Sequence, residues 1–161
     1  MLSTTSLIKK LRLDFPHLKF KKSDVSRWSH SRQTIYFNPN EKNANWIILH
    51  ELGHACLKHA SYQRDIELIS MEKDAWQYAL DKLSDRYDLS IDQDFIEDHI
   101  NTYRDWLHAK STCPGCSLTG VEKSKHNYHC LGCGQGWSTN EGTQVRIQRY
   151  SKNSINKPNL T

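Results

Sequence analysis

The residues best suited to chemistry are His50, Glu51 and His54, which form a His-Glu-x-x-His motif inside the apolar run from Trp46 to Leu57. Residues four positions apart lie on one face of an α-helix, so the two imidazoles can bind the same metal ion. Zn²⁺ accepts nitrogen ligands in tetrahedral geometry, and a catalytic zinc site keeps one position for water. We therefore expect Glu51 to act as the general base that takes a proton from zinc-activated water.

The helix that carries this motif is apolar on nearly every side, which predicts that it is buried. Unpaired charges are costly inside a protein, so buried His and Glu side chains need a metal ion or close pairing. Two interpretations follow, a catalytic zinc site and a purely structural His/Glu cluster. The metal site is the favoured one.

The cysteines point to a second metal site. Four of the five form two Cys-x-x-Cys pairs, which are Cys113, Cys116, Cys130 and Cys133. Four thiolates at this spacing can close a tetrahedral zinc site with no open position, so this zinc is expected to be structural. We predict a zinc ribbon with a C-terminal tail over residues 110–161, including a strand over residues 143–150, where apolar and polar side chains alternate.

The remaining elements are predicted from periodicity and from turn signals. A short helix is expected over residues 3–13 and a strand over residues 34–37, which could hold an extended peptide if it forms a sheet edge beside the metal. A second helix is expected over residues 70–84, where Glu72 opens an otherwise apolar stripe. Since the first metal site lacks a third protein ligand, Glu72 is a candidate for it. A further helix is expected to start in a capping box at Ser90.

Composition and charge suggest a protein that works in the cytoplasm. No run reaches the roughly 20 apolar residues of a membrane-spanning helix, and lysine and arginine near the N-terminus stand where a signal peptide needs its apolar core. The net charge is +4, with basic outer parts around an acidic middle. Mutual neutralisation of these parts is favoured over a nucleic-acid surface, although Lys123, Lys125, Arg146, Arg149 and Trp137 are candidates for DNA contact through the ribbon.

Residues 34–83 resemble the ImmA/IrrE family of small zinc metallopeptidases, most specifically from His50 to Leu80. The family follows its zinc helix with a second helix of pattern Glu-x-x-Ala-x-x-x-Ala, which falls on Glu72 here. The resemblance implies that Glu72 is the third ligand of the catalytic zinc. It also suggests a protein substrate, with a transcriptional repressor as one candidate, but it does not cover the ribbon.

The SprT family is the rival, because its His-Glu-x-x-His proteins carry a C-terminal zinc ribbon and act on DNA-bound proteins. Its third ligand is a later histidine, for which His59 is the nearby candidate; Glu72 is favoured.

These patterns together predict an α+β chain, with a zincin-type metallopeptidase domain of helices and a short sheet over residues 1–109 and a ribbon over 110–161. The expected function is zinc-dependent hydrolysis of peptide bonds in an intracellular protein. A SprT-like protease and a non-catalytic, zinc-stabilised module for protein or nucleic-acid binding remain alternatives.

Overall fold

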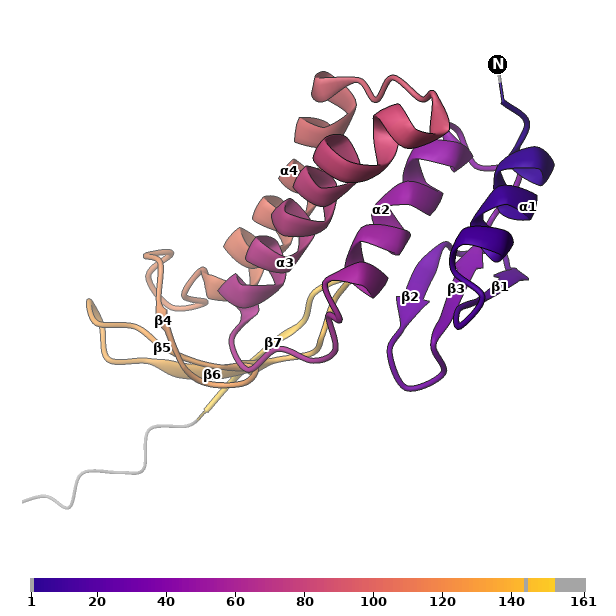
Figure 1. The fold of residues 1–161 in the computed structure, drawn as a ribbon. Helices are drawn as coiled ribbons and strands as arrows, with labels where there is room; N and C mark the ends of the chain where they lie inside the picture. The colour runs from indigo at the N-terminus through magenta and orange to yellow at the C-terminus, as the bar shows by residue number, and fades with distance from the viewer. Residues whose placement is uncertain (1, 144, 153–161) are drawn as a thin grey trace, which may run out of the picture. The chain divides into compact units, whose positions relative to one another are not determined.

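The computed structural model describes residues 2–143 and 145–152, which form a mixed α+β structure (Figure 1). Its α-helices are α1 (Thr4–Asp14), α2 (Ala44–Cys56), α3 (Asp65–Tyr78) and α4 (Gln93–Ser111). A π-helix, η1 (Ala79–Ser84), and a 3₁₀-helix, η2 (Asp85–Tyr87), follow α3. The strands are β1 (Lys19–Lys22), β2 (Arg27–Ser29), β3 (Thr34–Phe37), β4 (Val121–Ser124), β5 (Asn127–His129), β6 (Gly136–Thr139) and β7 (Arg149–Ser151). None of the described helices combines the length and the apolar composition needed to cross a membrane.

The chain forms two compact units. The first comprises the chain up to Ser61 together with Ser70–Glu97, and the second comprises Tyr62–Ile69 with the chain from Asp98 onward. One limit falls between α2 and α3, and the other two fall inside α3 and α4. The domain boundary expected between residues 109 and 110 stays a prediction.

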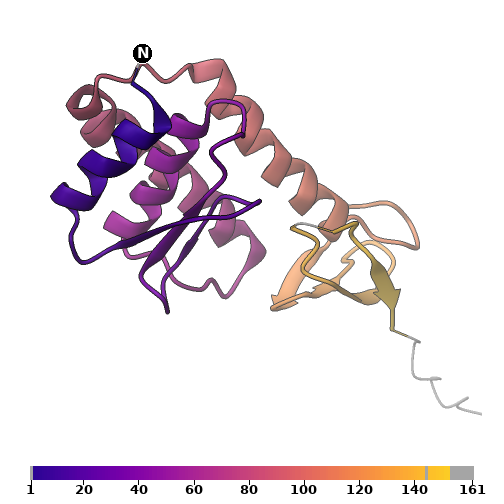
Figure 2. The same ribbon diagram turned by 90° about the vertical axis from the view of Figure 1, so that its right-hand side faces the viewer.

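The first unit contains a three-stranded sheet in the order β1-β3-β2, with β1 parallel and β2 antiparallel to β3. Helix α2 packs beside β2 and β3, as Figures 1 and 2 show. The strand predicted at residues 34–37 is β3, but it lies in the middle of the sheet, so the idea that it forms a peptide-binding edge is wrong. The edge strand next to α2 is β2.

Helix α2 is buried along most of its length, as its apolar composition predicts. It also approaches α3 closely, because a Cβ at Gly53 would lie 2.5 Å from the carbonyl oxygen of Ala75. Only glycine permits this approach without a shift of the backbone. The contact places the two helices that carry His50 and Glu72 next to each other.

Two helix starts differ from the sequence predictions. Helix α3 begins at Asp65 rather than near Ser70, because the Glu67 carboxylate accepts hydrogen bonds from the backbone N–H groups of Gln63 (2.8 Å) and Arg64 (3.3 Å) and caps an earlier turn. Helix α4 begins at Gln93, and the Asp92 side chain, rather than Ser90, accepts the hydrogen bond from the Asp94 backbone at 2.8 Å.

The second unit contains an antiparallel sheet in the order β4-β5-β6-β7. The strand predicted over residues 143–150 is largely wrong, because only Arg149 and Tyr150 of that range lie in β7. The Asn140 side chain donates to the carbonyl of Arg146 and accepts from the backbone of Gln148, both at 2.9 Å. These bonds satisfy the backbone in a loop instead of a ladder. Gln144 lies outside the described residues.

Candidate metal centres

Three side chains of the first unit meet in the protein interior. The Nε2 atoms of His50 and His54 lie 3.2 Å apart, and the Glu72 carboxylate lies 3.0 Å from the first and 3.4 Å from the second. All three residues are buried. Helix α2 supplies the histidines one turn apart, and α3 supplies the glutamate. We refer to these three residues as the His/Glu/His group.

The spacing of this group fits a tetrahedral metal ion. Nitrogen and oxygen atoms bound at about 2.0–2.1 Å to tetrahedral zinc lie about 3.3–3.4 Å from each other. The longest observed separation, 3.4 Å from His54 to Oε1 of Glu72, falls in that range, while those of 3.2 Å between the histidines and 3.0 Å from His50 to Oε2 of Glu72 fall below it. The donor set, two imidazoles and a carboxylate, is one that zinc uses in hydrolytic sites. The group could therefore hold a metal ion.

The carboxylate and the imidazoles of this group stabilise each other's charged forms. Although burial opposes it, hydrogen bonding with His50 and His54 holds the pKa of Glu72 well below its usual range. Burial lowers the pKa of His54, but the hydrogen bond with Glu72 outweighs that effect, so its pKa is raised. A stable carboxylate anion is the form of Glu72 that binds a cation.

Glu51 lies beside this group and is also buried. Burial raises the pKa of Glu51 to about 7, and the His54 charge and a hydrogen bond from the backbone of Trp28 oppose this rise. A carboxyl group with a pKa near neutrality can both accept and return a proton under physiological conditions. The hydrogen bond from Trp28, in β2, fixes the carboxylate relative to the sheet edge.

His59 contacts the far side of His54 rather than the centre of the group. The two Nδ1 atoms lie 2.8 Å apart, while the Nε2 atom of His54 faces His50 and Glu72. Backbone bonds hold His59 in place, because its N–H donates to His54 (3.0 Å) and its carbonyl accepts from the indole of Trp28 (2.8 Å). This arrangement favours Glu72 over His59 as the third ligand.

The contact with His59 also bears on the tautomer of His54. A ligand histidine binds a metal through one nitrogen when the other carries the proton, which a hydrogen-bond acceptor stabilises. Burial lowers the pKa of His59, and the charge of His54 lowers it further. Its neutral ring can accept that hydrogen bond.

We expect His59→Ala to weaken metal binding at the His/Glu/His group about 10- to 100-fold, as loss of such partners usually does. His59→Gln, which keeps an acceptor oxygen, should recover part of the loss. Titration with Co²⁺ separates this site from the cysteine site, because only thiolate ligands give intense charge-transfer absorption. If the wild type and His59→Ala bound Co²⁺ with equal affinity at this site, His59 would not be the hydrogen-bond partner that supports His54 as a ligand.

The four ribbon cysteines also come together. The sulfur atoms of Cys113 and Cys133 lie 3.6 Å apart, those of Cys116 and Cys130 lie 3.5 Å apart, and all four lie within 4.8 Å of one another. Thiolates bound at about 2.3 Å to tetrahedral zinc are separated by about 3.8 Å. None of the four forms a disulfide. The cluster could hold a metal ion.

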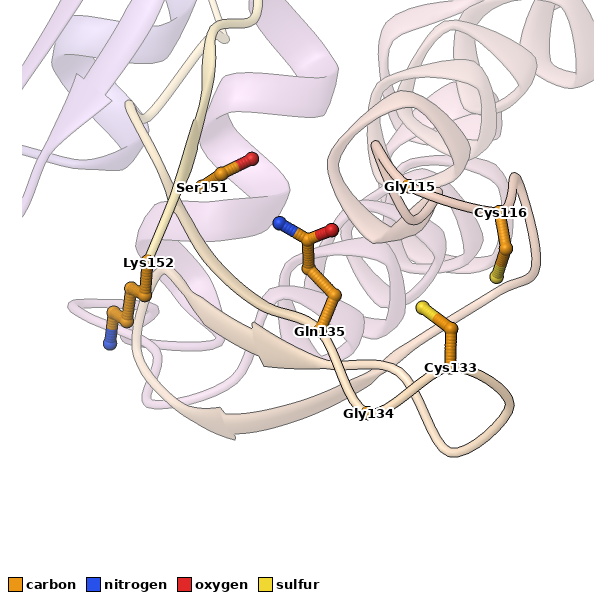
Figure 3. Close-up of a pocket in the computed structure, with 7 residues that line it drawn as sticks. All are labelled: Gly115, Cys116, Cys133, Gly134, Gln135, Ser151 and Lys152. Atoms are coloured by element: carbon orange, nitrogen blue, oxygen red, sulfur yellow. The ribbon is translucent and has the colours of Figure 1, made fainter. Parts of the chain in front are cut away.

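The backbone around these cysteines favours thiolates. The N–H of Gly115 lies 3.4 Å from the sulfur of Cys113, and backbone hydrogen bonds from Cys133 and Gly132 help lower the pKa of Cys130 to about 7. The thiolate is the form that binds metals. Cys116 and Cys133 are the exposed members of the cluster. They border an open pocket of about 400 Å³ that lies between the two Cys-x-x-Cys loops and the end of β7 (Figure 3).

No protein-family model, curated protein or solved structure matches this chain. The distances and burial of the side chains therefore carry the assignment of each site residue.

One predicted contact residue is in the wrong place for its expected role. Trp137, a candidate for DNA binding, is fully buried. Its ring stacks on Tyr128, with centroids 5.7 Å apart, and its indole donates to the carbonyl of Lys110 at 2.9 Å. Trp137 is therefore a core residue of the second unit, and the DNA contact suggested for it is wrong.

The second unit also contains a buried ion pair that sequence analysis missed. The Lys110 ammonium lies 2.8 Å from the Asp65 carboxylate, and both side chains are fully buried. Tyr128 donates to the same carboxylate at 2.6 Å, and Lys110 contacts the Nδ1 of His126 at 2.9 Å. The pair joins the start of α3 to the end of α4 within this unit. Asp65 and Lys110 lie 45 positions apart in the printed sequence, so no local spacing indicated the contact.

We expect Lys110→Ala to lower the free energy of unfolding by about 3–5 kcal/mol, because it leaves the Asp65 carboxylate buried without its cation. Lys123→Ala, at an exposed lysine of β4, should change the free energy of unfolding by less than about 0.5 kcal/mol. Urea unfolding followed by circular dichroism measures both. A loss below about 1 kcal/mol for Lys110→Ala would mean that the pair contributes little.

Proposed function

We propose that this chain is a zinc-dependent endopeptidase with a zincin-type catalytic domain, similar to the ImmA/IrrE family, and a structural zinc ribbon. The observation that carries this proposal is the convergence of His50, His54 and Glu72 at tetrahedral spacing, with the Glu51 carboxyl buried beside them. A purely structural cluster would not need a further carboxyl group at the same place.

In this proposal His50, His54 and Glu72 hold the catalytic zinc. When bound there, zinc supplies a Lewis acid that polarises the scissile carbonyl and lowers the pKa of the attacking water. Glu51 takes the proton from that water and returns it to the leaving amine. The backbone of Trp28 keeps the Glu51 carboxylate in position, and His59 orients the ring of His54.

The substrate would be an extended segment of an intracellular protein. Strand β2 pairs with β3 on one side and carries no second strand partner among the described residues. An extended peptide can add to such a sheet edge through main-chain hydrogen bonds. Because Trp28 of β2 contacts both Glu51 and His59, a peptide on this edge would lie next to the reacting groups. A transcriptional repressor is one candidate substrate.

The SprT-like alternative is less well supported, because His59 lies on the wrong side of His54 to complete the metal site. The ribbon retains its role as a structural zinc domain in either case.

A peptide library tests the activity directly. The zinc-loaded chain is incubated with unstructured peptides of mixed sequence, and mass spectrometry detects new termini. Cleavage that disappears with a chelator and returns with zinc would support the proposal. Absence of cleavage in the library and in candidate repressors, with both metal sites loaded, would favour a non-catalytic, zinc-stabilised module.

A further inference from the structure

The face of the first sheet that carries Tyr36 is strongly basic. The register places Lys21, Tyr36 and Arg27 side by side across β1, β3 and β2, and Lys19 lies two residues before Lys21 on the same face. The next row, which includes Phe20 and Ile35, points to the other face, where both side chains are buried. The sheet therefore has an apolar face in the core and a cationic face outside.

Tyr36 is the centre of this cationic face. The guanidinium carbon of Arg27 lies 4.2 Å from the ring centroid, and Arg32 donates a hydrogen bond to the phenol oxygen at 3.4 Å. The hydrogen bond from Arg32 lowers the pKa of Tyr36 and outweighs burial, which raises it, and the charges of Arg32, Lys21 and Arg27 lower it further. The charges with the largest effect on the phenol are therefore those of cations.

The cations of this face are not neutralised within the protein. Lys19, Lys21, Arg27 and Arg32 are all exposed, and none lies within ion-pair distance of a carboxylate in the described part of the chain. Lys21 and Arg27 flank Tyr36 from β1 and β2, two strands that lie about 10 Å apart, and like charges within about this distance repel each other at ordinary ionic strength. An anionic partner would offset this cost.

We propose that this face, formed by Lys19, Lys21, Arg27, Arg32 and Tyr36, binds the sugar–phosphate backbone of a single-stranded nucleic acid. Alternate residues of a strand lie about 6.6 Å apart and neighbouring strands about 4.8 Å apart, so the cations form an extended array suited to a repeated charge. Proteins bind single strands through a cationic surface combined with aromatic and arginine planes. None of these five residues is aliphatic, whereas the grooves that hold amphipathic peptides are apolar.

This proposal is independent of the peptidase activity, because none of these residues belongs to a metal group. It also differs from the ribbon contact expected from the sequence. Nucleic acid bound here would lie on the sheet that carries Trp28 on its opposite face.

The test compares two charge-matched variants of the full chain, both loaded with zinc. Lys21→Gln combined with Arg27→Gln removes two cations from the face, and Lys9→Gln combined with Lys10→Gln removes two exposed cations from α1. Fluorescence anisotropy measures binding of a labelled 20-nucleotide single strand between about 50 and 300 mM salt. Zinc content checks that each variant is folded.

We expect the wild type to bind with a clear salt dependence. The sheet variant should bind about tenfold or more weakly at low salt, and the magnitude of its slope of log K against log salt should fall by about 1.4. The helix variant should match the wild type. The proposal would be overturned if both variants were weakened equally, if the sheet variant bound as tightly as the wild type, or if the wild type did not bind at about 50 mM salt. It would also be overturned if polyglutamate of the same charge competed as well as the nucleic acid.

Discussion

Glu51→Gln is expected to reduce peptide hydrolysis by at least about 10²- to 10⁴-fold, the usual contribution of a general base. The amide has almost the shape of the carboxylate and can still accept the hydrogen bond from the backbone of Trp28, but it cannot take a proton. Zinc binding should be unchanged, because His50, His54 and Glu72 remain. The loss should therefore appear in kcat with metal content preserved.

The experiment measures kcat and KM on a peptide from the library, together with zinc per chain. Glu141→Gln is a suitable control, because Glu141 is an exposed residue of the second unit and undergoes the same substitution outside the metal group. Full activity in Glu51→Gln would mean that Glu51 is not the general base, and that the hydrolysis comes from a different base or from a contaminating protease.

Glu72→Ala is expected to lower the zinc content from about two ions per chain to about one, with the ribbon cysteines intact. The Glu72 carboxylate contacts both ligand histidines, at 3.0 and 3.4 Å, so its removal leaves two neutral imidazoles for the metal. Two nitrogen ligands hold zinc far more weakly than three ligands that include an anion. Hydrolysis should disappear together with the metal.

Elemental analysis after dialysis against a weak chelator measures this change. Asp74→Ala, an exposed acidic residue on the same helix, should keep about two zinc ions. One zinc in both the wild type and Glu72→Ala would mean that only the ribbon binds metal, and the non-catalytic module would become the better explanation. Two zinc ions in Glu72→Ala would show that another residue completes the site.

Much of the candidate site could be predicted from the sequence because its parts obey local geometry. His50 and His54 share a helix face whenever the segment is helical, and the apolar run around them makes the helix buried. The paired spacing of Cys113, Cys116, Cys130 and Cys133 likewise depends on short loops. The resemblance to ImmA/IrrE pointed to Glu72, which periodicity had already marked as a carboxylate on an apolar stripe.

Other features depend on contacts between distant segments, for which local spacing gives no signal. Only the fold shows that β2, rather than residues 34–37, forms the sheet edge beside α2, and that Trp137 is buried. Most of the strand predicted over residues 143–150 does not form, because the side-chain amide of Asn140 binds the backbone of Arg146 and Gln148 and competes with strand pairing.

The sequence by itself therefore determined which residues can bind metal and supply a base, since helical periodicity and loop length act over a few positions. The tertiary structure alone decided which side of His54 faces Glu72 and which faces His59, because the close approach of α2 and α3 at Gly53 and the turn after α2 set those distances. It also brought Lys110 to Asp65 and gathered the cations around Tyr36. Those contacts depend on tertiary packing and strand register, which local sequence spacing does not specify.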